Sequence, residues 1–308
     1  MMCRKPFLSE QGAFPCGQCE PCRASRRRQW ASRLELESVC HSQSSFVTLT
    51  YSDQNMKLLN VGSVTEPCFR GTLVPRDLQS FLKRFRRAIA PLRIRFFAVG
   101  EYGARTFRPH YHAILFGWPG CSNGRTKRVV GSGGPDWSNC CGNCSVVGRA
   151  WRVGGVDVGS VTQQSLAYVA QYTTKKMTSA GDFRLRGRYP EFARMSLSPG
   201  IGSEAMWNVA SCMFEFRLDE SLDDVPVALS RGRLVLGRYL RDKLRERVGR
   251  LKGAPQAVRD RMAKELQLVR SFAWSAGISV KETLSLLDEG RYAAFIAKSK
   301  IYQRRNVL

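Results

Sequence analysis

Two of the three histidines in this chain stand two positions apart, at His110 and His112. The run that contains them, residues 108–116, ends in apolar and branched residues and predicts a β-strand. Side chains alternate between the faces of a strand, so both imidazoles would point the same way. Neutral imidazole is a common metal ligand, and the pair therefore predicts part of a metal site. Two polar residues at the mouth of a strand are the alternative.

A carboxylate precedes the histidines by a short distance in sequence. Residues 93–99 predict a second strand, which leads to Glu101 and then through a loop into the histidine strand. Two strands connected in this way form a β-hairpin and lie side by side, so Glu101 is our candidate for a third metal ligand. An ion pair of this carboxylate with Arg105 or Arg108 is the alternative.

Two tyrosines one helical turn apart offer nucleophiles. Residues 160–177 begin with a sequence that resembles a capping box and predict a helix, on which Tyr168 and Tyr172 share one face. Lys175 and Lys176 continue that face. A tyrosine oxygen can attack phosphorus and form a covalent phosphotyrosine, and a neighbouring lysine charge would stabilise the negative charge that develops. A tyrosine pair on an ordinary helix surface is the alternative.

The cysteines form two groups. Their number, eleven, is odd and poorly suited to a disulfide framework. Regular spacing of the first group predicts a tetrahedral zinc site formed by Cys3, Cys16, Cys19 and Cys22, with free thiols beside a helix as the alternative. The second group is Cys121, Cys140, Cys141 and Cys144, and its less regular spacing does not decide between zinc and free thiols. It lies in residues 117–160, which we interpret as a Gly- and Cys-rich insertion rather than core.

The chain is strongly basic, with 49 Lys and Arg against 25 Asp and Glu and a net charge of +24. Such an excess predicts a polyanionic partner, and nucleic acid is the natural one. Residues 231–308 have the densest positive charge, with 19 basic and 7 acidic residues. Solvated helix faces are the alternative for individual basic residues. The DNA contacts that we expect come from Arg26, Arg27, Arg28, Lys83 and Arg87.

Targeting signals are not evident from the sequence. We find no run of 18 or more apolar residues that would span a membrane. The first residues, Met1 to Pro6, lack the apolar segment of a signal peptide. We therefore expect an intracellular protein with reduced thiols.

Three regions are predicted along the chain. Residues 1–45 form a Cys-rich basic segment, residues 46–224 contain the histidines and tyrosines, and residues 225–308 are basic and mostly helical. An acidic stretch, residues 219–224, marks the second boundary. Further strands are expected at residues 46–51 and 206–218, and further helices from Pro75, around 234–244, at 255–276 and at 279–300.

Three motifs in this order resemble those of HUH endonucleases, the enzymes that initiate rolling-circle replication. They are Phe46–Tyr51, His110-Tyr111-His112 and Tyr168-x-x-x-Tyr172-x-x-Lys175. The wider pattern is similar to the replication initiators of microviruses, especially gokushoviruses. These also have an N-terminal Cys-x-x-Cys-x-x-Cys-Arg segment and a Gly-Glu-Tyr-Gly…Arg-Pro-His-Tyr-His stretch. The resemblance covers about residues 1–178.

The resemblance implies a fold of class α+β, with a central antiparallel sheet of RRM-like or ferredoxin-like type and flanking helices. It implies Mg²⁺ or Mn²⁺ at His110 and His112 with an acidic or polar third ligand. A tyrosine would nick one strand of a viral replicative-form DNA at its origin, remain on the 5′ phosphate and leave a 3′ hydroxyl for a polymerase. The second tyrosine would cut after one round, and the displaced strand would be rejoined into a circle.

The same resemblance implies origin and single-stranded DNA as partners. A host helicase and polymerase would join them, in the cytoplasm of a bacterial host cell. Relaxases share this chemistry but usually place the tyrosine before the histidines. A zinc-stabilised nucleic-acid-binding protein without catalytic activity fits the charge and the cysteines equally well, but it does not explain the two tyrosines.

Overall fold

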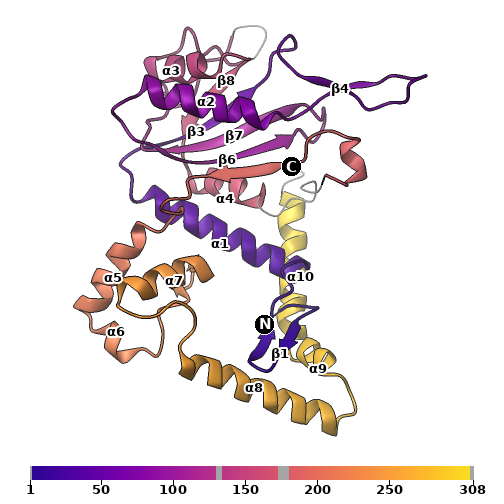
Figure 1. The fold of residues 1–308 in the computed structure, drawn as a ribbon, viewed down its shortest axis with the longest axis vertical. Coiled ribbons are helices and arrows are strands. Elements are labelled where there is room, and N and C mark those ends of the chain that lie inside the picture. Colours follow the sequence, from indigo (N-terminus) through magenta and orange to yellow (C-terminus); the bar gives the residue numbers. More distant parts are fainter. Residues whose placement is uncertain (1, 130–133, 173–179, 306–308) are drawn as a thin grey trace. The chain divides into compact units, whose positions relative to one another are not determined.

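The computed structural model describes residues 2–129, 134–172 and 180–305 (Figure 1). The chain divides into two compact units. One consists of residues Met1–Gln29 and Trp207–Leu308, and the other of residues Trp30–Met206. The histidines, Glu101 and the tyrosines all belong to the second one.

A five-stranded antiparallel sheet is the centre of the unit formed by residues 30–206. Its strand order is β8-β3-β7-β6-β9, so β7, which contains both histidines, is the central strand. The predictions of an α+β fold, of a strand near residues 46–51 and of a hairpin ending in the histidine strand are confirmed. The strands are β3 (Ser44–Thr50), β6 (Arg95–Tyr102), β7 (Pro109–Phe116), β8 (Val156–Ser160) and β9 (Phe192–Met195).

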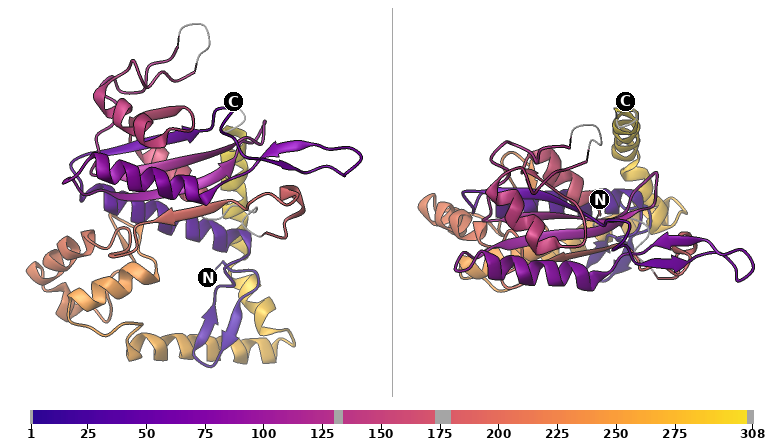
Figure 2. Two further views of the ribbon diagram at one scale, coloured as in Figure 1. Left: turned by 45° about the horizontal axis from the view of Figure 1, so that its top comes forward. Right: turned by 90° about the horizontal axis from the view of Figure 1, so that it is seen from above.

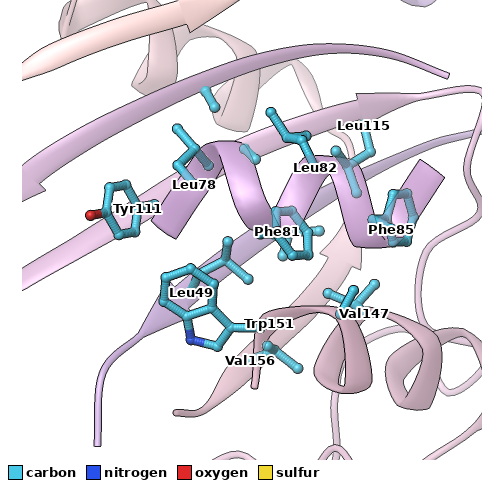
Figure 3. Close-up of a cluster of buried hydrophobic side chains, with 14 of the residues drawn as sticks. Leu49, Leu78, Phe81, Leu82, Phe85, Tyr111, Leu115, Val147, Trp151 and Val156 are labelled. Atoms are coloured by element: carbon cyan, nitrogen blue, oxygen red, sulfur yellow. The ribbon is translucent and has the colours of Figure 1, made fainter. Parts of the chain in front are cut away.

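One face of the sheet is covered by α2 (Pro75–Ala88) and α3 (Gly142–Trp151) (Figures 1 and 3). Helix α2 begins with Pro75, whose fixed φ suits the first helical position. Its apolar residues recur every three or four positions and are all buried, as the sequence predicts: Leu78, Phe81, Leu82 and Phe85. The fully buried Trp151 at the end of α3 packs among these aromatic rings. This face therefore forms the larger apolar core.

The opposite face packs against α4 (Gln163–Gln171) and the second half of α1 (Glu20–Ser38). Leu34 from α1 and Val169 from α4 are fully buried against Phe97 and Ile114 of the sheet. A hairpin of β4 (Leu58–Asn60) and β5 (Phe69–Gly71) extends beyond the sheet (Figure 2). A short 3₁₀ helix, Phe183–Leu185, precedes β9.

The other unit is mainly helical. Two short hairpins belong to it, β1 (Phe7–Ser9) with β2 (Gly12–Phe14) and β10 (Ala228–Leu229) with β11 (Leu234–Val235). Its helices are α6 (Leu218–Ser221), α7 (Arg238–Arg247), α8 (Gln256–Ser275), α9 (Val280–Leu287) and α10 (Glu289–Arg305). The predicted helical C-terminal region is thus confirmed, although the helix expected at 279–300 is two helices.

The strand predicted at residues 206–218 is wrong. These residues form helix α5 (Ala205–Glu215) and the start of α6. The buried residues Met206, Ala210 and Met213 are spaced by four and three positions, which is the helical period. The aromatic residues that favoured a strand, Phe214 and Phe216, are exposed.

Residues 117–160 are not wholly outside the core, contrary to our interpretation of them as an insertion. They supply α3, with the fully buried Trp151, and the edge strand β8, in which Val156 and Val158 are fully buried. In the part of the chain that the structure describes, no helix has the length and apolar character needed to cross a bilayer.

Candidate metal and tyrosine site

The β6–β7 hairpin brings Glu101 to the two histidines. Glu101 lies directly opposite His110 in the strand register, and His112 lies opposite Val99. The Glu101 Oε1 atom is 2.8 Å from His110 Nε2 and 3.0 Å from His112 Nε2. Glu101 is 3% exposed, so this carboxylate is enclosed by the hairpin and its neighbours.

The alternative contact for this carboxylate does not form with Arg108. Arg108 instead donates to Asp53 and to the carbonyl oxygen of Tyr51. Both acceptors lie before the β4–β5 hairpin in sequence. Arg108 therefore holds the chain after β3, while Glu101 faces the imidazoles.

Both imidazole rings are oriented by contacts to their Nδ1 atoms. His110 Nδ1 lies 3.1 Å from the Arg108 carbonyl oxygen, and His112 Nδ1 lies 3.0 Å from the Thr48 hydroxyl. A carbonyl oxygen only accepts, so the proton of a neutral His110 ring must be on Nδ1. Its Nε2 then presents a lone pair to an acceptor-only carboxylate. A metal ion bound by both atoms is one arrangement that accounts for this short contact.

The donor set fits a small divalent ion. Ligand atoms about 2.1 Å from an octahedral ion and at right angles to each other are about 3.0 Å apart. The two nitrogen–oxygen distances, 2.8 and 3.0 Å, agree with that separation. Two imidazoles with one carboxylate also form a mixed nitrogen and oxygen set, which suits Mn²⁺ or Mg²⁺ better than a set of thiolates would. His110, His112 and Glu101 can therefore hold such an ion.

Helix α4 places the tyrosines beside this cluster. Its N-terminus is a capping box in which Thr162 accepts from the N–H of Ser165 and Ser165 returns a hydrogen bond to the Thr162 N–H. The capping residue is thus two positions after Ser160, where the sequence suggested it. Leu166, Val169 and Ala170 are buried on the sheet, as expected. The described part of this helix ends at its C-cap, Tyr172.

The two tyrosines are neighbours but differ in accessibility. Their ring centroids are 5.0 Å apart. The Tyr168 hydroxyl lies 3.4 Å from Glu101 Oε1 and 3.5 Å from His112 Nε2. Its side chain is 40% exposed, whereas Tyr172 is 8% exposed and packs in the core on this face of the sheet. Of this pair, Tyr168 is therefore the one that is both next to the cluster and open to solvent.

Burial raises the pKa of Tyr168, and the nearby Glu101 carboxylate adds to this, while a hydrogen bond with Tyr172 opposes it. Deeper burial raises the pKa of Tyr172 strongly. Both phenols are therefore held in the protonated form when no metal ion is near. Positive charge close to the hydroxyl oxygen would be needed to stabilise a phenolate.

Not every residue singled out in the sequence lies at this site. Lys175 and Lys176 lie outside the residues that the structure describes. Lys83 and Arg87 are exposed on α2, which covers the opposite face of the sheet. Arg26, Arg27 and Arg28 are exposed on the part of α1 that belongs to the other unit.

Two residues of β3 belong to the site, although the sequence analysis placed them only within the motif Phe46–Tyr51 and gave neither a role at the site. Thr48 lies opposite His112 in the register and contacts its Nδ1. The ring of Phe46 stacks on the His112 ring at 5.4 Å with an interplanar angle of 23°. Alternation along residues 46–50 could have indicated that Phe46 and Thr48 share a face, but the pairing of β3 with β7 was needed to bring them to the histidine.

The first cysteine group is also brought together. The Sγ atoms of Cys3, Cys16, Cys19 and Cys22 all lie within 4.8 Å of one another. The backbone N–H groups of Cys19 and Gln18 donate to the Cys16 Sγ and lower its pKa to about 6. Hydrogen bonds of this kind stabilise a thiolate, which is the form that binds metals. The second cysteine group forms a similar cluster of Cys121, Cys140, Cys141 and Cys144.

Comparison with known proteins identifies relatives among phage replication proteins. The chain is 31% identical over 194 residues to the replication-associated protein ORF2 of Spiroplasma virus 4, a match that covers 61% of this chain and 56% of the relative. It is 30% identical over 170 residues to the replication-associated protein VP4 of Bdellovibrio phage phiMH2K, covering 55% and 50%. The replication-associated protein ORF4 of Chlamydia phage 1 is 25% identical over 237 residues, covering 76% and 54%.

These matches span about half the length of each relative. No solved structure matches the chain. The family model of the replication-associated protein ORF2 type matches residues 44–177, which include β3, the β6–β7 hairpin and helix α4. This segment contains the histidines, Glu101 and both tyrosines, so the part of the chain that forms the candidate site is similar to this family of replication-associated proteins.

Proposed function

We propose that this protein is a rolling-circle replication initiator that nicks one strand of a viral replicative-form DNA at its origin. The observation on which the proposal rests is the position of the Tyr168 hydroxyl, 3.4 Å from Glu101 Oε1 and 3.5 Å from His112 Nε2. A nucleophilic oxygen beside a set of divalent-metal ligands is the arrangement that a metal-dependent phosphoryl transfer requires. The five-stranded antiparallel sheet that supports it would be of the HUH type.

His110, His112 and Glu101 would hold Mg²⁺ or Mn²⁺. When bound, the ion would polarise a phosphate oxygen. Its positive charge would also stabilise the phenolate of Tyr168, whose pKa the protein otherwise raises. Thr48 and the Arg108 carbonyl oxygen keep the Nδ1 atoms engaged, so that both Nε2 atoms point toward Glu101. The chain thereby fixes the ligand atoms before any ion or DNA arrives.

Cleavage would be a transesterification. The Tyr168 hydroxyl already donates toward Glu101 Oε1, which gives its proton an acceptor. A bond forms between the Tyr168 oxygen and phosphorus, the bond from phosphorus to the 3′ oxygen breaks, and the 3′ oxygen gains a proton. The products are a 5′-phosphotyrosine and a free 3′ hydroxyl for a host polymerase. Because one phosphodiester replaces another, attack by a 3′ hydroxyl can reverse the step and rejoin the strand.

Accessibility indicates the order in which the tyrosines act. Tyr168 is 40% exposed and Tyr172 is 8% exposed, so Tyr168 would make the first cut. Tyr172 would make the second cut after one round of replication, and the displaced strand would then be circularised. Lys175 and Lys176 follow within four residues of Tyr172 in sequence. Their charge would stabilise the phenolate and the transition state.

Basic residues elsewhere would bind the DNA backbone. Exposed arginines at positions 26–28, together with Lys83 and Arg87, are suited to phosphate contacts. The cluster of Cys3, Cys16, Cys19 and Cys22 would hold a structural zinc ion beside the arginines. Residues 231–308, with 19 basic and 7 acidic residues, would bind DNA without sequence specificity or contact a host helicase. With these activities, the protein would act in the cytoplasm of a bacterial host cell.

The test is the formation of a covalent adduct. The protein is incubated with Mn²⁺ and single-stranded oligonucleotides that tile both strands of the encoding genome, and adducts are resolved on a denaturing gel. We expect one oligonucleotide to react, and peptide mass mapping to place the adduct on Tyr168. The double variant Tyr168→Phe, Tyr172→Phe should form none, and a chelator should prevent the reaction.

Tyr189→Phe is the matched control, because Tyr189 lies in the same unit and is also 40% exposed. It should leave the adduct unchanged. Persistent DNA binding by the wild-type protein without any adduct would favour the alternative function, a zinc-stabilised nucleic-acid-binding protein without catalytic activity.

A further inference from the structure

The second cysteine cluster has the geometry of a tetrahedral metal site. The Sγ atoms of Cys121, Cys140, Cys141 and Cys144 all lie within 4.8 Å of one another. Cys121 Sγ is 3.4 Å from Cys140 Sγ and 3.8 Å from Cys141 Sγ. Four thiolates around a zinc ion at about 2.3 Å would be about 3.8 Å apart. A disulfide would require about 2.05 Å, so these thiols are not bonded to each other.

Local structure positions the four thiols. Cys141 is the N-cap of α3 and Cys144 lies in its first turn, three residues later, so both face the same side of the helix. Cys140 precedes them directly. Cys121 comes from the segment after β7, on the other side of the loop. The fold thus brings Cys121 and Cys140 into contact although they are 19 positions apart in sequence.

Polar groups around the cluster engage the sulfur atoms. The Lys127 N–H donates to Cys140 Sγ at 3.2 Å, and Asn123 Nδ2 lies 3.5 Å from the same atom. The Thr126 hydroxyl is 3.3 Å from Cys144 Sγ and accepts from the Val158 N–H of β8 at 2.8 Å. Contacts of this kind orient the ligands of structural metal sites. Here they also connect the cluster to the edge of the sheet.

Burial and charge favour a bound cation. Cys144 is fully buried and Cys121 is 6% exposed. Sulfur atoms this close can be deprotonated together only when a cation neutralises them. Zn²⁺ is the ion that four cysteines in a tetrahedral arrangement bind most characteristically.

We propose that Cys121, Cys140, Cys141 and Cys144 hold a second structural zinc ion, which joins residues 121–127 and the start of α3 to strand β8. The ion would be a structural part of the unit that contains the histidines. Helix α3 ends at Trp151, whose ring packs 5.6 Å from that of Tyr111, the residue between His110 and His112. Loss of the ion would therefore loosen the support beneath the histidine strand.

Zinc content tests the proposal without reference to nicking. The protein is purified under reducing conditions without chelator, and zinc is measured against sulfur by mass spectrometry. We expect two zinc ions per wild-type chain, corresponding to the two clusters. Cys121→Ser with Cys141→Ser should retain one, and Cys16→Ser with Cys19→Ser should also retain one. Cys212→Ser, at an exposed cysteine outside both clusters, should retain two.

The effect of each zinc ion on thermal stability distinguishes the two cysteine clusters. Loss of the Cys121 cluster should lower the melting temperature of the 30–206 unit, measured through the near-ultraviolet signal of its buried tryptophan. If the serine variants do not fold, cobalt titration of the metal-free wild-type protein replaces them. Saturation of the thiolate-to-cobalt absorption at two equivalents supports the proposal. The absence of this absorption in Cys16→Ser with Cys19→Ser, zinc retained fully by Cys121→Ser with Cys141→Ser, or a disulfide within the cluster would overturn it.

Discussion

The two faces of the central sheet are built from alternate residues of the same strands but serve different purposes. From β7, Tyr111, Ala113 and Leu115 point to α2 and α3 and are fully buried in the larger core. His110 and His112 point to the opposite face, beside α4. A period of two residues thus separates the side chains that stabilise the fold from those that can do chemistry.

The polar atoms of the two faces are used differently. On the α2–α3 face, the Tyr111 hydroxyl lies 2.8 Å from that of Tyr51 and 2.9 Å from the Val74 carbonyl oxygen, so it is satisfied within the core. On the other face, nitrogen and oxygen atoms of three residues converge on one point. We expect substitutions on the first face to change stability and those on the second face to change function.

The largest effect should follow from truncation on the α2–α3 face. Trp151 is fully buried, and its indole N–H donates to the Thr50 carbonyl oxygen. Trp151→Ala would leave a cavity and an unsatisfied carbonyl, which should cost about 3–5 kcal/mol of unfolding free energy. Denaturant unfolding monitored by far-ultraviolet circular dichroism measures the change. A loss below about 1 kcal/mol would contradict the role of this face.

Substitution of a candidate ligand should give the opposite result. His110→Ala removes one ligand atom, and the rate of adduct formation should fall about 100-fold or more, equivalent to about 3 kcal/mol. The His110 side chain is 17% exposed, so the unfolding free energy should change by less than about 1 kcal/mol. Equal losses of stability and of adduct would show that the two faces are not separable.

The orientation of His112 gives a smaller and more specific test. Thr48→Val removes the hydroxyl at His112 Nδ1 and should weaken Mn²⁺ binding by about 10–100-fold, measured by calorimetry. Thr50→Val is the matched control, because Thr50 lies two residues along the same strand and its hydroxyl donates to the Gly155 carbonyl oxygen instead. Similar weakening in both variants would argue for a general effect on the strand.

The smallest effect concerns Glu37 of α1, which packs on the same side of the sheet as α4. Low pH should reduce the contribution of its carboxylate to the unfolding free energy. Burial by itself would raise the pKa of Glu37, but hydrogen bonds from His41, the Gly202 N–H and Arg95 outweigh it and hold the pKa below the ordinary 4.5. A depressed pKa contributes stability that is present above pH 4.5 and is lost as the pH falls through the lower folded value.

We therefore expect Glu37→Gln to lower the unfolding free energy at pH 7 by on the order of 1 kcal/mol. The difference between the variant and the wild-type protein should shrink at pH values well below the ordinary pKa of a glutamate. Urea unfolding at several pH values measures it. A difference that stays constant from neutral to strongly acidic pH would show that the charge of this carboxylate does not contribute.

The sequence predicted the histidine hairpin well because its signals are local. The apolar and branched residues at the end of 108–116 predicted the strand, and its connection through one loop to residues 93–99 predicted the antiparallel pairing that brings Glu101 to His110. The helical spacing of α2 and the tyrosine pair on α4 were equally direct. The residues that determine each of these elements are close together in sequence.

Features that depend on distant pairing were not predictable. Strand β9 is four residues long and lies at the sheet edge, so it has too few residues to show alternation. Thr48 contacts His112 across 64 positions of sequence. Helix α5 was mistaken for a strand because its exposed aromatic residues outweighed the helical spacing of its buried ones. The second cysteine cluster forms only because the loop between Cys121 and Cys140 brings distant thiols together, and the spacing of the cysteines does not predict this.

The placement of Glu101 directly across from His110 has a consequence for protein engineering. All three converging ligands belong to residues 95–116, a single continuous hairpin. A peptide of this length, or a graft of it onto two neighbouring antiparallel strands of an unrelated scaffold, would transfer the whole ligand set together. Insertion of one residue beside the ligands would instead turn the carboxylate, if made in β6, or an imidazole, if made in β7, to the opposite side and dismantle the set.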